Sequence, residues 1–492
     1  MRVLLVNPVM KRYYKSPTCP LGLLSIATYL HQQGHIIKII DAAVKNVNYQ
    51  KEISAFQPDI VGVSVISNKS IADAVRVSKT ARSQKIPVVW GGTLASAIPE
   101  IILRSGFVDY VVIGEGEITF DMLLEALKDR SPLANIDGLA FLRQGTVVVN
   151  PDRAFADLAD FPVLDWTFVN PADYFQQMFS ARKMLYLYSA KGCPARCTFC
   201  FNKGFNRCVY RARPFEHCLE EIAFLTSCCA MDGVHFADEL WCENKTQLAE
   251  KCEKLLSRFP ALVWGCNARI GSLAQPDFEL MYRAGCRWIF FGVESGSPDI
   301  QKLIKKGIEL HKVETTVRGC YEAGIVPVVS LILGFPDETP AQVRQTADLA
   351  RKLPEALFDV NFFFPLPATE LCDMLIQRGS YHLPATLREF SRLLPTEKLH
   401  DNFSKTPARD LKVVRSYFMW STFLRKGLLP GQGRPLAVKA VKDAFKGICR
   451  HGLGNAALSA AYDAATFLGI MAARTLHPRI RQQYGLFKRT QS

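Results

Sequence analysis

Short apolar runs rich in Val and Ile alternate with amphipathic stretches over residues 1–130. The runs are Val3–Val6, Ile36–Asp41, Ile60–Val65, Val88–Trp90 and Tyr110–Ile113. Apolar runs of this length are typical of parallel strands that are buried on both faces. The segments between them, such as Leu21–Gly34 and Ser70–Gln84, have the periodicity of amphipathic helices. We therefore predict an α/β fold with a doubly wound parallel sheet in this region.

The alternation stops over residues 131–183, where four prolines interrupt the chain, and it resumes at Met184. Six further runs follow: Leu185–Ala190, Val234–Ala237, Leu262–Cys266, Trp288–Gly292, Val326–Leu333 and Asp359–Phe364. Strands separated by helical stretches in this way predict consecutive β-α units, here a partial (β/α)6 barrel. Beyond about residue 385 the pattern is helical to the end.

We accordingly predict four regions: a Rossmann-like sheet domain over residues 1–130, a connector over 131–183, the partial barrel over 184–385 and a basic helical region over 386–492. Ligands of such parallel sheets gather at the carboxyl ends of the strands. The loops at these ends of the first sheet are rich in glycine. No Gly-x-Gly-x-x-Gly follows the first strand, however, so a dinucleotide-binding interpretation lacks its main support.

The composition is typical of a globular protein of the cytoplasm. Of the 492 residues 49% are apolar and 22% are charged, which excludes a largely disordered chain. No apolar run reaches the ~18 to 20 residues that a membrane-spanning helix needs. The start at Met1–Pro8 lacks the long apolar stretch of a signal peptide. We therefore expect a cytoplasmic location and interpret the 15 cysteines as thiols rather than disulfides.

The positive charge is concentrated in the last fifth of the chain. Residues 401–492 hold 16 Lys and Arg against 4 Asp and Glu, so most of the net charge of +14 lies there. Pro435–Cys449 has the pattern of a basic amphipathic helix, and Asn455–Ala473 that of a more apolar one. Such helices either cap a barrel with their apolar face or lie on an anionic membrane surface. The second alternative would place the protein at the periphery of the inner membrane surface.

Three of the cysteines form a motif directly after the first predicted barrel strand. Cys193, Cys197 and Cys200 have the spacing Cys-x3-Cys-x2-Cys. Three thiolates on one loop can ligate three irons of a cubane cluster and leave the fourth iron open for a ligand. A structural zinc site is the alternative, and it would take a further ligand such as Cys208 or His217.

With this motif, residues 184–370 resemble the radical SAM superfamily. The resemblance implies that the three cysteines hold a 4Fe–4S cluster whose open iron binds S-adenosylmethionine (SAM) through its amino and carboxylate groups. Reductive cleavage would then give methionine and a 5′-deoxyadenosyl radical. Phe199 lies where relatives have an aromatic side chain beside the adenine. An electron donor such as flavodoxin or ferredoxin is implied as a partner.

Further matches lie at successive strand ends of the predicted barrel. The resemblance assigns them to SAM binding: Asp238 and Glu239 for the ammonium, Arg269 for the carboxylate, Glu294 and Ser295 for the ribose, and Gly334 beside the adenine. A carboxylate that faces an ammonium group is chemically sensible. The sequence departs from the sixth-strand Pro-Gly-Thr of relatives at Ala368, which puts the adenine or substrate contacts of that strand in doubt.

The N-terminal region resembles the cobalamin-binding sheet of the cobalamin-dependent (class B) members of this superfamily. The candidate cofactor-binding positions lie at strand ends and at the start of the first helix: Pro20, Leu21, Gly22, Ser64, Gly91, Gly92, Thr93, Gly114, Glu115, Gly116 and Glu117. Small residues there allow the backbone to approach a flat corrin ring closely. None of the nine histidines lies in the Asp-x-His-x-x-Gly motif that supplies a cobalt ligand in many cobalamin folds. A nucleotide-binding or ligand-free sheet is the alternative.

Taken together, the resemblance implies an enzyme with a 4Fe–4S cluster, SAM and cobalamin. We expect a methyltransferase that moves a methyl group from methylcobalamin to an unactivated carbon after hydrogen abstraction by the 5′-deoxyadenosyl radical. The same cofactors suit an oxidative cyclase or ring-rearranging enzyme, and a non-catalytic cobalamin or iron–sulfur sensor is a third alternative. The expected substrate is a small or lipid-like molecule, and nucleic acid is not expected as a partner.

Overall fold

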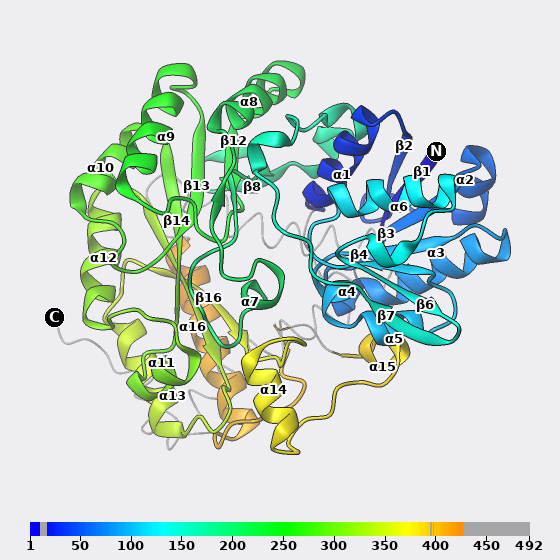
Figure 1. The fold of residues 1–492 in the computed structure, drawn as a ribbon. Coiled ribbons are helices and arrows are strands. Elements are labelled where there is room, and N and C mark those ends of the chain that lie inside the picture. The colour runs from blue at the N-terminus through cyan, green and yellow to red at the C-terminus, as the bar shows by residue number, and fades with distance from the viewer. Residues whose placement is uncertain (10–16, 394–395, 397, 427–492) are drawn as a thin grey trace.

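The computed structural model describes residues 1–9, 17–393, 396 and 398–426, and these residues form two seven-stranded sheets (Figure 1). Sheet A has the strand order β2-β1-β3-β4-β5-β6-β7, and sheet B has the order β16-β15-β14-β13-β12-β9-β8. Sheet A lies on the right of Figure 1 and the curled sheet B on the left. The predicted α/β fold with a doubly wound sheet and a partial barrel is confirmed. The helices predicted at Pro435–Cys449 and Asn455–Ala473 lie outside the described residues.

Sheet A contains the five predicted strands and two more. Its elements are β1 (Arg2–Asn7), α1 (Leu21–Gln32), β2 (Ile36–Asp41), α2 (Tyr49–Phe56), β3 (Ile60–Ser64), α3 (Ile71–Ser83), β4 (Val88–Gly91), α4 (Thr93–Ala97), α5 (Pro99–Leu103), β5 (Tyr110–Val112), α6 (Glu117–Asp129), β6 (Leu139–Arg143) and β7 (Thr146–Val149). Strands β1 to β5 are parallel, whereas β6 and β7 add an antiparallel hairpin from the region predicted as a connector.

The apolar runs of sheet A are continuous because both of its faces are covered. In β1, Val3 and Leu5 pack against α1 and α6, while Leu4 and Val6 pack against α2 and α3 on the other face. Alternate side chains of a strand point to opposite faces, so each face requires apolar residues of its own. The continuous apolar runs that predicted buried parallel strands therefore result from the burial of both faces of the sheet.

Sheet B is the curled, partial barrel. Its elements are β8 (Gln176–Met178), β9 (Ala181–Leu187), α8 (Phe215–Cys229), β12 (Gly233–Phe236), α9 (Lys245–Arg258), β13 (Val263–Ala268), α10 (Gln275–Arg283), β14 (Cys286–Glu294), α11 (Pro298–Ile304), α12 (His311–Glu322), β15 (Val326–Leu333), α13 (Pro340–Arg351) and β16 (Leu357–Phe362). One large core joins alternate strand residues to α8, α9, α10, α12 and α13 on the outer face. Within sheet B the neighbouring strands β9, β12, β13, β14, β15 and β16 pair in parallel, and β8 adds an antiparallel edge.

The remaining elements connect and cover the two sheets. They are the 3-10 turns η1 (Asn68–Ser70), η2 (Leu133–Asn135), η3 (Leu158–Asp160), η4 (Trp166–Phe168) and η5 (Pro171–Tyr174), the short strands β10 (Ala190–Lys191) and β11 (Arg211–Ala212), and the helices α7 (Asn202–Phe205), α14 (Glu370–Gln377), α15 (Leu387–Phe390) and α16 (Ala408–Lys426). No helix among the described residues is long and apolar enough to cross a membrane.

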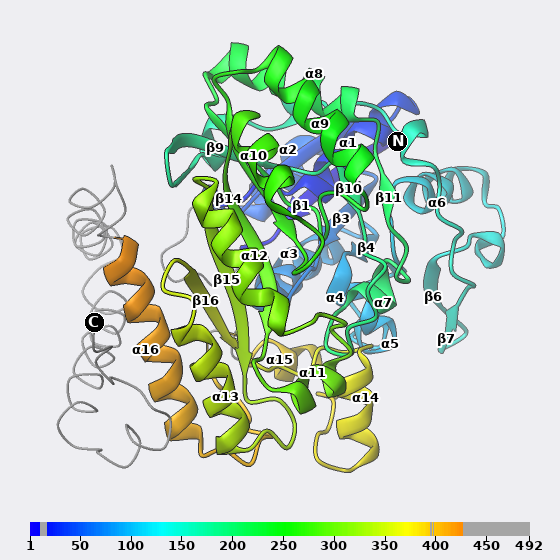
Figure 2. The same cartoon turned by 90° about the vertical axis from the view of Figure 1, so that its left-hand side faces the viewer.

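Helix α16 protects the free edge of the barrel. It runs beside β16 (Figure 2), where Thr422 Oγ1 accepts a 2.7 Å hydrogen bond from the backbone N–H of Phe358. Arg415 Nε donates to the carbonyl oxygen of Val360 at 2.8 Å. An unpaired edge strand would otherwise expose these backbone groups to pairing with another chain.

The two sheets are held together by contacts on both sides. Tyr174, in the segment before the barrel, donates a 3.0 Å hydrogen bond from its hydroxyl to Asp41 Oδ2 at the end of β2. The backbone N–H of Asp165 donates to Thr28 Oγ1 in α1 at 3.0 Å. After the barrel, the chain returns to sheet A, where Leu387 and Phe390 of α15 join the core around α3. Loops that follow strands of both sheets line one common cavity.

Candidate functional site

The cysteine loop lies on a two-stranded ribbon formed by β10 and β11. Gly192, between the ribbon and Cys193, has φ +81°, and a Cβ there would lie 2.0 Å from the carbonyl oxygen of Val209. Only glycine fits this position, because it combines a left-handed backbone with a close backbone approach. The N–H of Gly192 donates to Glu239 Oε2 at 2.9 Å, which attaches the loop to the end of β12.

Asn202 closes the cysteine loop from inside. Its Nδ2 donates to the carbonyl oxygen of Cys193 at 2.6 Å, and its Oδ1 accepts from the N–H of the same residue at 3.2 Å. Asn202 is 2% exposed, so these bonds replace water for a buried amide. Sequence reasoning missed this residue, although an Asn two positions after the last cysteine was a signal.

The three predicted cluster ligands lie on this one loop. Cys193 and Cys197 are buried, and Cys200 is partly buried. Burial raises the pKa of Cys200 to about 11 and also raises the pKa of Cys197, although the positive charges of Lys306 and Arg269 act in the opposite direction at Cys197. Buried thiols beside cations suit a cluster, because each thiolate binds an iron and the cations offset the negative charge.

Among the described residues, no three or more His, Cys, Asp and Glu side chains are arranged to hold a single metal ion. A cubane with three cysteine ligands makes a different demand, because each thiolate binds a different iron.

Three predicted SAM-binding residues surround one lysine that the sequence analysis missed. Lys306 Nζ lies 2.7 Å from Glu294 Oε1 and 5.9 Å from the ring centroid of Phe199. The carbonyl oxygen of Lys306 accepts a 2.6 Å hydrogen bond from Arg269 Nη2. Burial opposes the charge of Lys306, but the interactions with Glu294 and Cys197 together outweigh burial, so the pKa of Lys306 is raised. Lys306 and Glu294 therefore form a charged ion pair at the mouth of the barrel.

Glu294 has an unusual backbone at the end of β14. Its φ is +67°, at a register shift between Gly292 and Glu294 in the pairing with β15. A Cβ at Gly292 would lie 2.5 Å from both Glu294 Oε1 and Lys306 Nζ. A left-handed conformation costs a residue other than glycine of order 1 kcal/mol, and such strain concentrates at functional sites. The Gly-x-Glu sequence thus creates room for the ion pair.

Other predicted SAM-binding residues use their polar atoms inside the fold. The two carboxylate oxygens of Asp238 accept bonds from Ser189, from its N–H at 2.7 Å and from its Oγ at 2.6 Å. Burial raises the pKa of Asp238 to about 6. Ser295 is fully buried, and its Oγ lies 3.1 Å from Thr346 Oγ1 in α13. Glu239 differs from both, because it faces the cysteine loop; the assignments of all three residues stay predictions.

Gly334 follows β15 with φ +85°, a left-handed backbone conformation that favours glycine, and its assignment to the adenine stays a prediction. Its N–H donates to Glu338 Oε2 at 2.7 Å.

A large cavity lies between the carboxyl ends of sheet A and the cysteine loop. It measures ≈ 1010 Å³ out to its open mouth. The predicted cobalamin-binding positions that line it are Gly22, Ser64, Gly91, Gly92, Thr93, Gly114, Glu115, Gly116 and Glu117, whereas Pro20 and Leu21 lie outside the lining. The barrel contributes Lys191, Phe205, Asn206 and Glu239. The cavity is therefore shared by the two domains.

The chemistry of this cavity fits a corrin. Its deeper wall is apolar, with Leu5, Val89 and Phe120 among the lining residues. A Cβ at Gly22 or at Gly114 would meet nothing within 4 Å, so the absence of side chains leaves free volume beside the backbone. A flat macrocycle with an apolar body and amide side chains needs such a surface, with polar groups at the rim.

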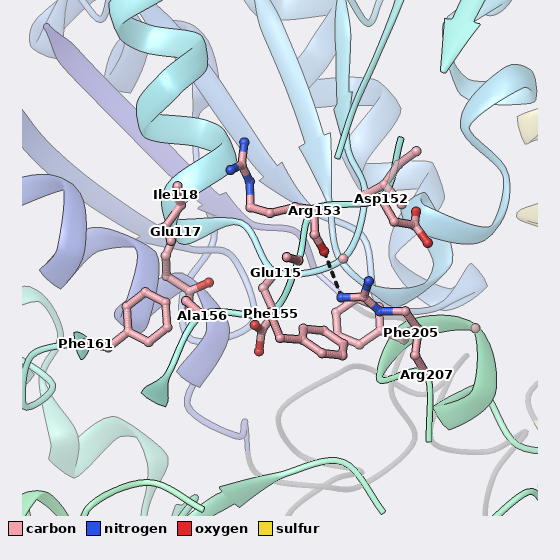
Figure 3. A pocket seen from close by; sticks show the side chains of 14 residues that line it. Glu115, Glu117, Ile118, Asp152, Arg153, Phe155, Ala156, Phe161, Phe205 and Arg207 are labelled. Atoms are coloured by element: carbon pink, nitrogen blue, oxygen red, sulfur yellow. Dashed lines mark hydrogen bonds between the residues drawn. The ribbon is translucent and has the colours of Figure 1, made fainter. Parts of the chain in front are cut away.

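A second cavity of ≈ 480 Å³ shares the lining residues Gly114, Glu115, Glu117 and Phe205 with the first. Figure 3 shows the side chains that line this second cavity. The cavity is lined by both carboxylates and by Phe155, which lies beside Arg207. The guanidinium carbon of Arg207 is 3.6 Å from the ring centroid of Phe155, and that of Arg211 is 3.9 Å away. The connector thus inserts an aromatic ring between two cations of the barrel.

Comparisons with known proteins agree with this geometry. Residues 9–124 match the B12 binding domain family, and residues 187–350 match the Radical SAM superfamily. An uncharacterized methyltransferase of Pyrococcus horikoshii is 28% identical over 92% of this chain and 98% of its own. The radical SAM methyltransferase TsrM of Kitasatospora setae, with cobalamin and a [4Fe-4S] cluster bound, is 19% identical, with a TM-score of 0.64 over 77% of this chain and 75% of its own. The cobalamin-dependent radical enzyme OxsB, with aqua-cobalamin and SAM bound, is 17% identical, with a TM-score of 0.67 over 96% and 72% of the two chains.

Proposed function

The chain belongs to the cobalamin-dependent radical SAM enzymes, and from this premise we propose that it is a methyltransferase that acts on an unactivated carbon of a small-molecule substrate. Two of the similar proteins, one of Pyrococcus horikoshii and one of Kitasatospora setae, are named as methyltransferases. When bound, the cluster and SAM supply a carbon-centred radical and cobalamin supplies the methyl group. The residues of this chain bind these groups and determine where they meet.

The observation that carries the proposal is the cavity shared by the two domains. Glycine loops of sheet A form one wall, and Lys191 of the ribbon that bears the cysteine loop forms part of another. Transfer of a methyl group between two cofactors requires that both reach one substrate, because reacting groups must be held close and oriented. A corrin in this cavity would lie beside the cluster loop.

We assign the chain's residues to three tasks. Cys193, Cys197 and Cys200 hold the cluster. Glu294 and Lys306 present a carboxylate and an ammonium at the barrel mouth, which suits the hydroxyl, amino and carboxylate groups of SAM.

The glycine loops of sheet A hold the corrin, while Glu115 and Glu117 at their rim offer carboxylates to amide N–H groups.

Product analysis tests the proposal. The protein would be purified without oxygen, loaded with iron, sulfide and hydroxocobalamin, and incubated with SAM and a strong reductant. We expect S-adenosylhomocysteine and 5′-deoxyadenosine together, measured by mass spectrometry. The first product should vanish without cobalamin. The second should vanish in the Cys197→Ala variant and persist in Cys208→Ala, a matched control because Cys208 follows the same loop outside the motif.

Two other results would contradict the proposal. With a range of candidate acceptors present, 5′-deoxyadenosine without S-adenosylhomocysteine would indicate a radical cyclisation or rearrangement in place of methyl transfer. Neither product from protein with a full cluster would indicate a sensing role. Lipid-like acceptors belong in the panel, because the lipid-like substrate and the membrane contact of the basic C-terminal region stay predictions.

A further inference from the structure

The ribbon beneath the cysteine loop carries two like charges in direct opposition. Lys191 on β10 pairs with Arg211 on β11. Like charges at opposite positions destabilise a strand pair. Glu115, from the loop after β5, pairs with both cations: its Oε1 lies 3.1 Å from Lys191 Nζ, and Arg211 binds its two oxygens at 2.7 and 3.0 Å. The ribbon of the barrel therefore depends on a carboxylate of the sheet domain.

A second carboxylate completes the set. Glu117 Oε1 lies 3.3 Å from Lys191 Nζ and accepts a 2.6 Å hydrogen bond from Ser25 Oγ. The side chains of Lys191, Arg211, Glu115 and Glu117 are 22%, 13%, 13% and 4% exposed. Water screens such partly buried charges weakly, and removal of one partner leaves the others uncompensated. We call these four residues the interdomain bridge.

The bridge lines the cavity of sheet A and adjoins the start of the cysteine loop. Glu115, Glu117 and Lys191 line the large cavity. Lys191 also directly precedes Gly192, whose backbone is fixed by Glu239 and by the close approach of Val209. A shift of the Lys191 backbone is therefore passed directly to Gly192, at the start of the cysteine loop. Conversely, a rigid cysteine loop fixes the position of Lys191, and Lys191 in turn orients Glu115 and Glu117.

We infer that the interdomain bridge couples the two cofactor sites, so that a filled cavity favours the assembled cluster and the assembled cluster favours a filled cavity. The inference rests on the proposed function in that both cofactors bind this one chain. Glu115, Lys191 and Arg211 act as positioning residues. A coupling of this kind is reciprocal and typically amounts to about 5- to 150-fold in affinity.

The test is an anaerobic titration of the full chain with hydroxocobalamin, followed by absorbance, before and after assembly of the cluster. We expect the Kd to be at least about fivefold lower with the cluster present. In Glu115→Gln and in Lys191→Met the two Kd values should agree within about twofold. The double variant should show no further change, because residues of one network are not additive.

A matched control and a milder variant distinguish the loss of the interdomain bridge from a general loss of folding. Glu125→Gln removes a carboxylate from the exposed side of α6, 45% exposed, and should keep the wild-type ratio of Kd values. Arg211→Lys keeps the positive charge but loses the two-pronged contact with Glu115, and should give an intermediate ratio. Iron per chain and far-ultraviolet circular dichroism are measured for each variant.

The outcomes separate the inference from the proposed function. Equal Kd values with and without the cluster in the wild type would overturn the coupling and leave the methyltransferase proposal intact. A Glu115→Gln variant that binds more weakly but keeps the wild-type ratio would make Glu115 a cofactor contact only, which also overturns it. Absence of cobalamin binding in both forms would overturn both ideas. An intact coupling without S-adenosylhomocysteine would count against the proposed function alone.

Discussion

The cavity beside sheet A is shaped by missing side chains, whereas the mouth of sheet B is filled with charged ones. Along the cavity, glycines at the strand ends leave the backbone bare, and the deeper wall is apolar. At the barrel mouth, Glu294 and Lys306 form an ion pair beside Phe199, and Arg269 holds the carbonyl oxygen of Lys306. The first region offers shape and the second offers charge.

This difference predicts two kinds of sensitivity. A shaped apolar cavity loses affinity when volume is added, because packed walls yield little. A charged mouth loses affinity when one partner of an ion pair is removed, because the other is left uncompensated. Volume changes in sheet A and charge changes in sheet B should therefore affect different cofactors.

The largest effect is expected in the cysteine loop, where an added methyl group would both clash with the backbone and disturb the cluster ligands. In Gly192→Ala, the new Cβ would lie 2.0 Å from the carbonyl oxygen of Val209 at a φ of +81°. We expect the loss of most bound iron and a fall of at least about a hundredfold in 5′-deoxyadenosine formation, equivalent to ~3 kcal/mol. Iron analysis and mass spectrometry measure both.

The matched control for this variant is Gly145→Ala. Gly145 also has a positive φ, +79°, but a Cβ there meets nothing within 4 Å. Gly145→Ala therefore places alanine in the same left-handed backbone conformation as Gly192→Ala but creates no clash with a neighbouring atom. Equal iron loss in both variants would attribute the effect to backbone strain alone.

A second prediction separates charge from volume. Lys306→Met removes the cation from Glu294 and keeps a side chain of similar length. We expect the Kd for SAM to rise about thirtyfold (~2 kcal/mol), while the Kd for hydroxocobalamin stays within about twofold. Lys302→Met, exposed on α11, is the control and should change neither. An equal loss of both affinities would show that Lys306 supports the cobalamin cavity as well as the SAM site.

The third prediction adds volume to sheet A without a change of charge. A Cβ at Gly62, in the middle of β3, would lie 2.8 Å from Leu5 Cδ2 and 3.0 Å from Phe120 Cε1. In Gly62→Ala one of these side chains must move into the cavity, and we expect the Kd for hydroxocobalamin to rise about tenfold. SAM affinity and iron content should stay unchanged. Unaltered cobalamin binding would place the corrin away from this wall.

The two regions also differ in how far the sequence could predict them. Cys193, Cys197 and Cys200 lie on one short segment and could be proposed as cluster ligands from their spacing. The cavity positions lie at separate strand ends, and they were proposed from the resemblance to cobalamin-binding sheets. Lys306 could not be identified in either way, because it follows Glu294 by 12 residues and meets it only through the fold of α11. The internal partners of Asp238 and Ser295 were equally hidden, since a motif does not show to which side a carboxylate or hydroxyl turns.

The hairpin of β6 and β7 was missed for another reason. Its turn at Gln144 and Gly145 has φ values of +51° and +79°, which is typical of the turns that join two antiparallel strands. A dipeptide that ends in glycine between two apolar runs was the signal. The prolines around it favoured a connector instead. The turn between β6 and β7 could therefore have been predicted from its local sequence, whereas contacts between distant strands could not.

The smallest expected effect is a pH dependence at the barrel mouth. Glu338 beneath Gly334 is fully buried, and burial raises its pKa from 4.5 to about 7. Its Oε1 has no hydrogen-bond partner among the described residues, in contrast to the cation-paired Glu294. Because the folded state then binds the proton more tightly than the unfolded state, stability is fully present below pH 4.5 and falls as the pH rises toward 7.

The measurement is the Tm of the chain between pH 5 and 8. We expect the wild type to lose about 2 °C per pH unit relative to Glu338→Gln up to pH ~7, because the amide carries no charge at any of these pH values. Glu100→Gln, an exposed position on α5, should run parallel to the wild type. If the Glu338→Gln curve also runs parallel to the wild type, the carboxyl titrates as it does in water. The barrel mouth would then tolerate a buried charge without a cation, and the contrast with the apolar cavity of sheet A would rest on the Glu294–Lys306 pair alone.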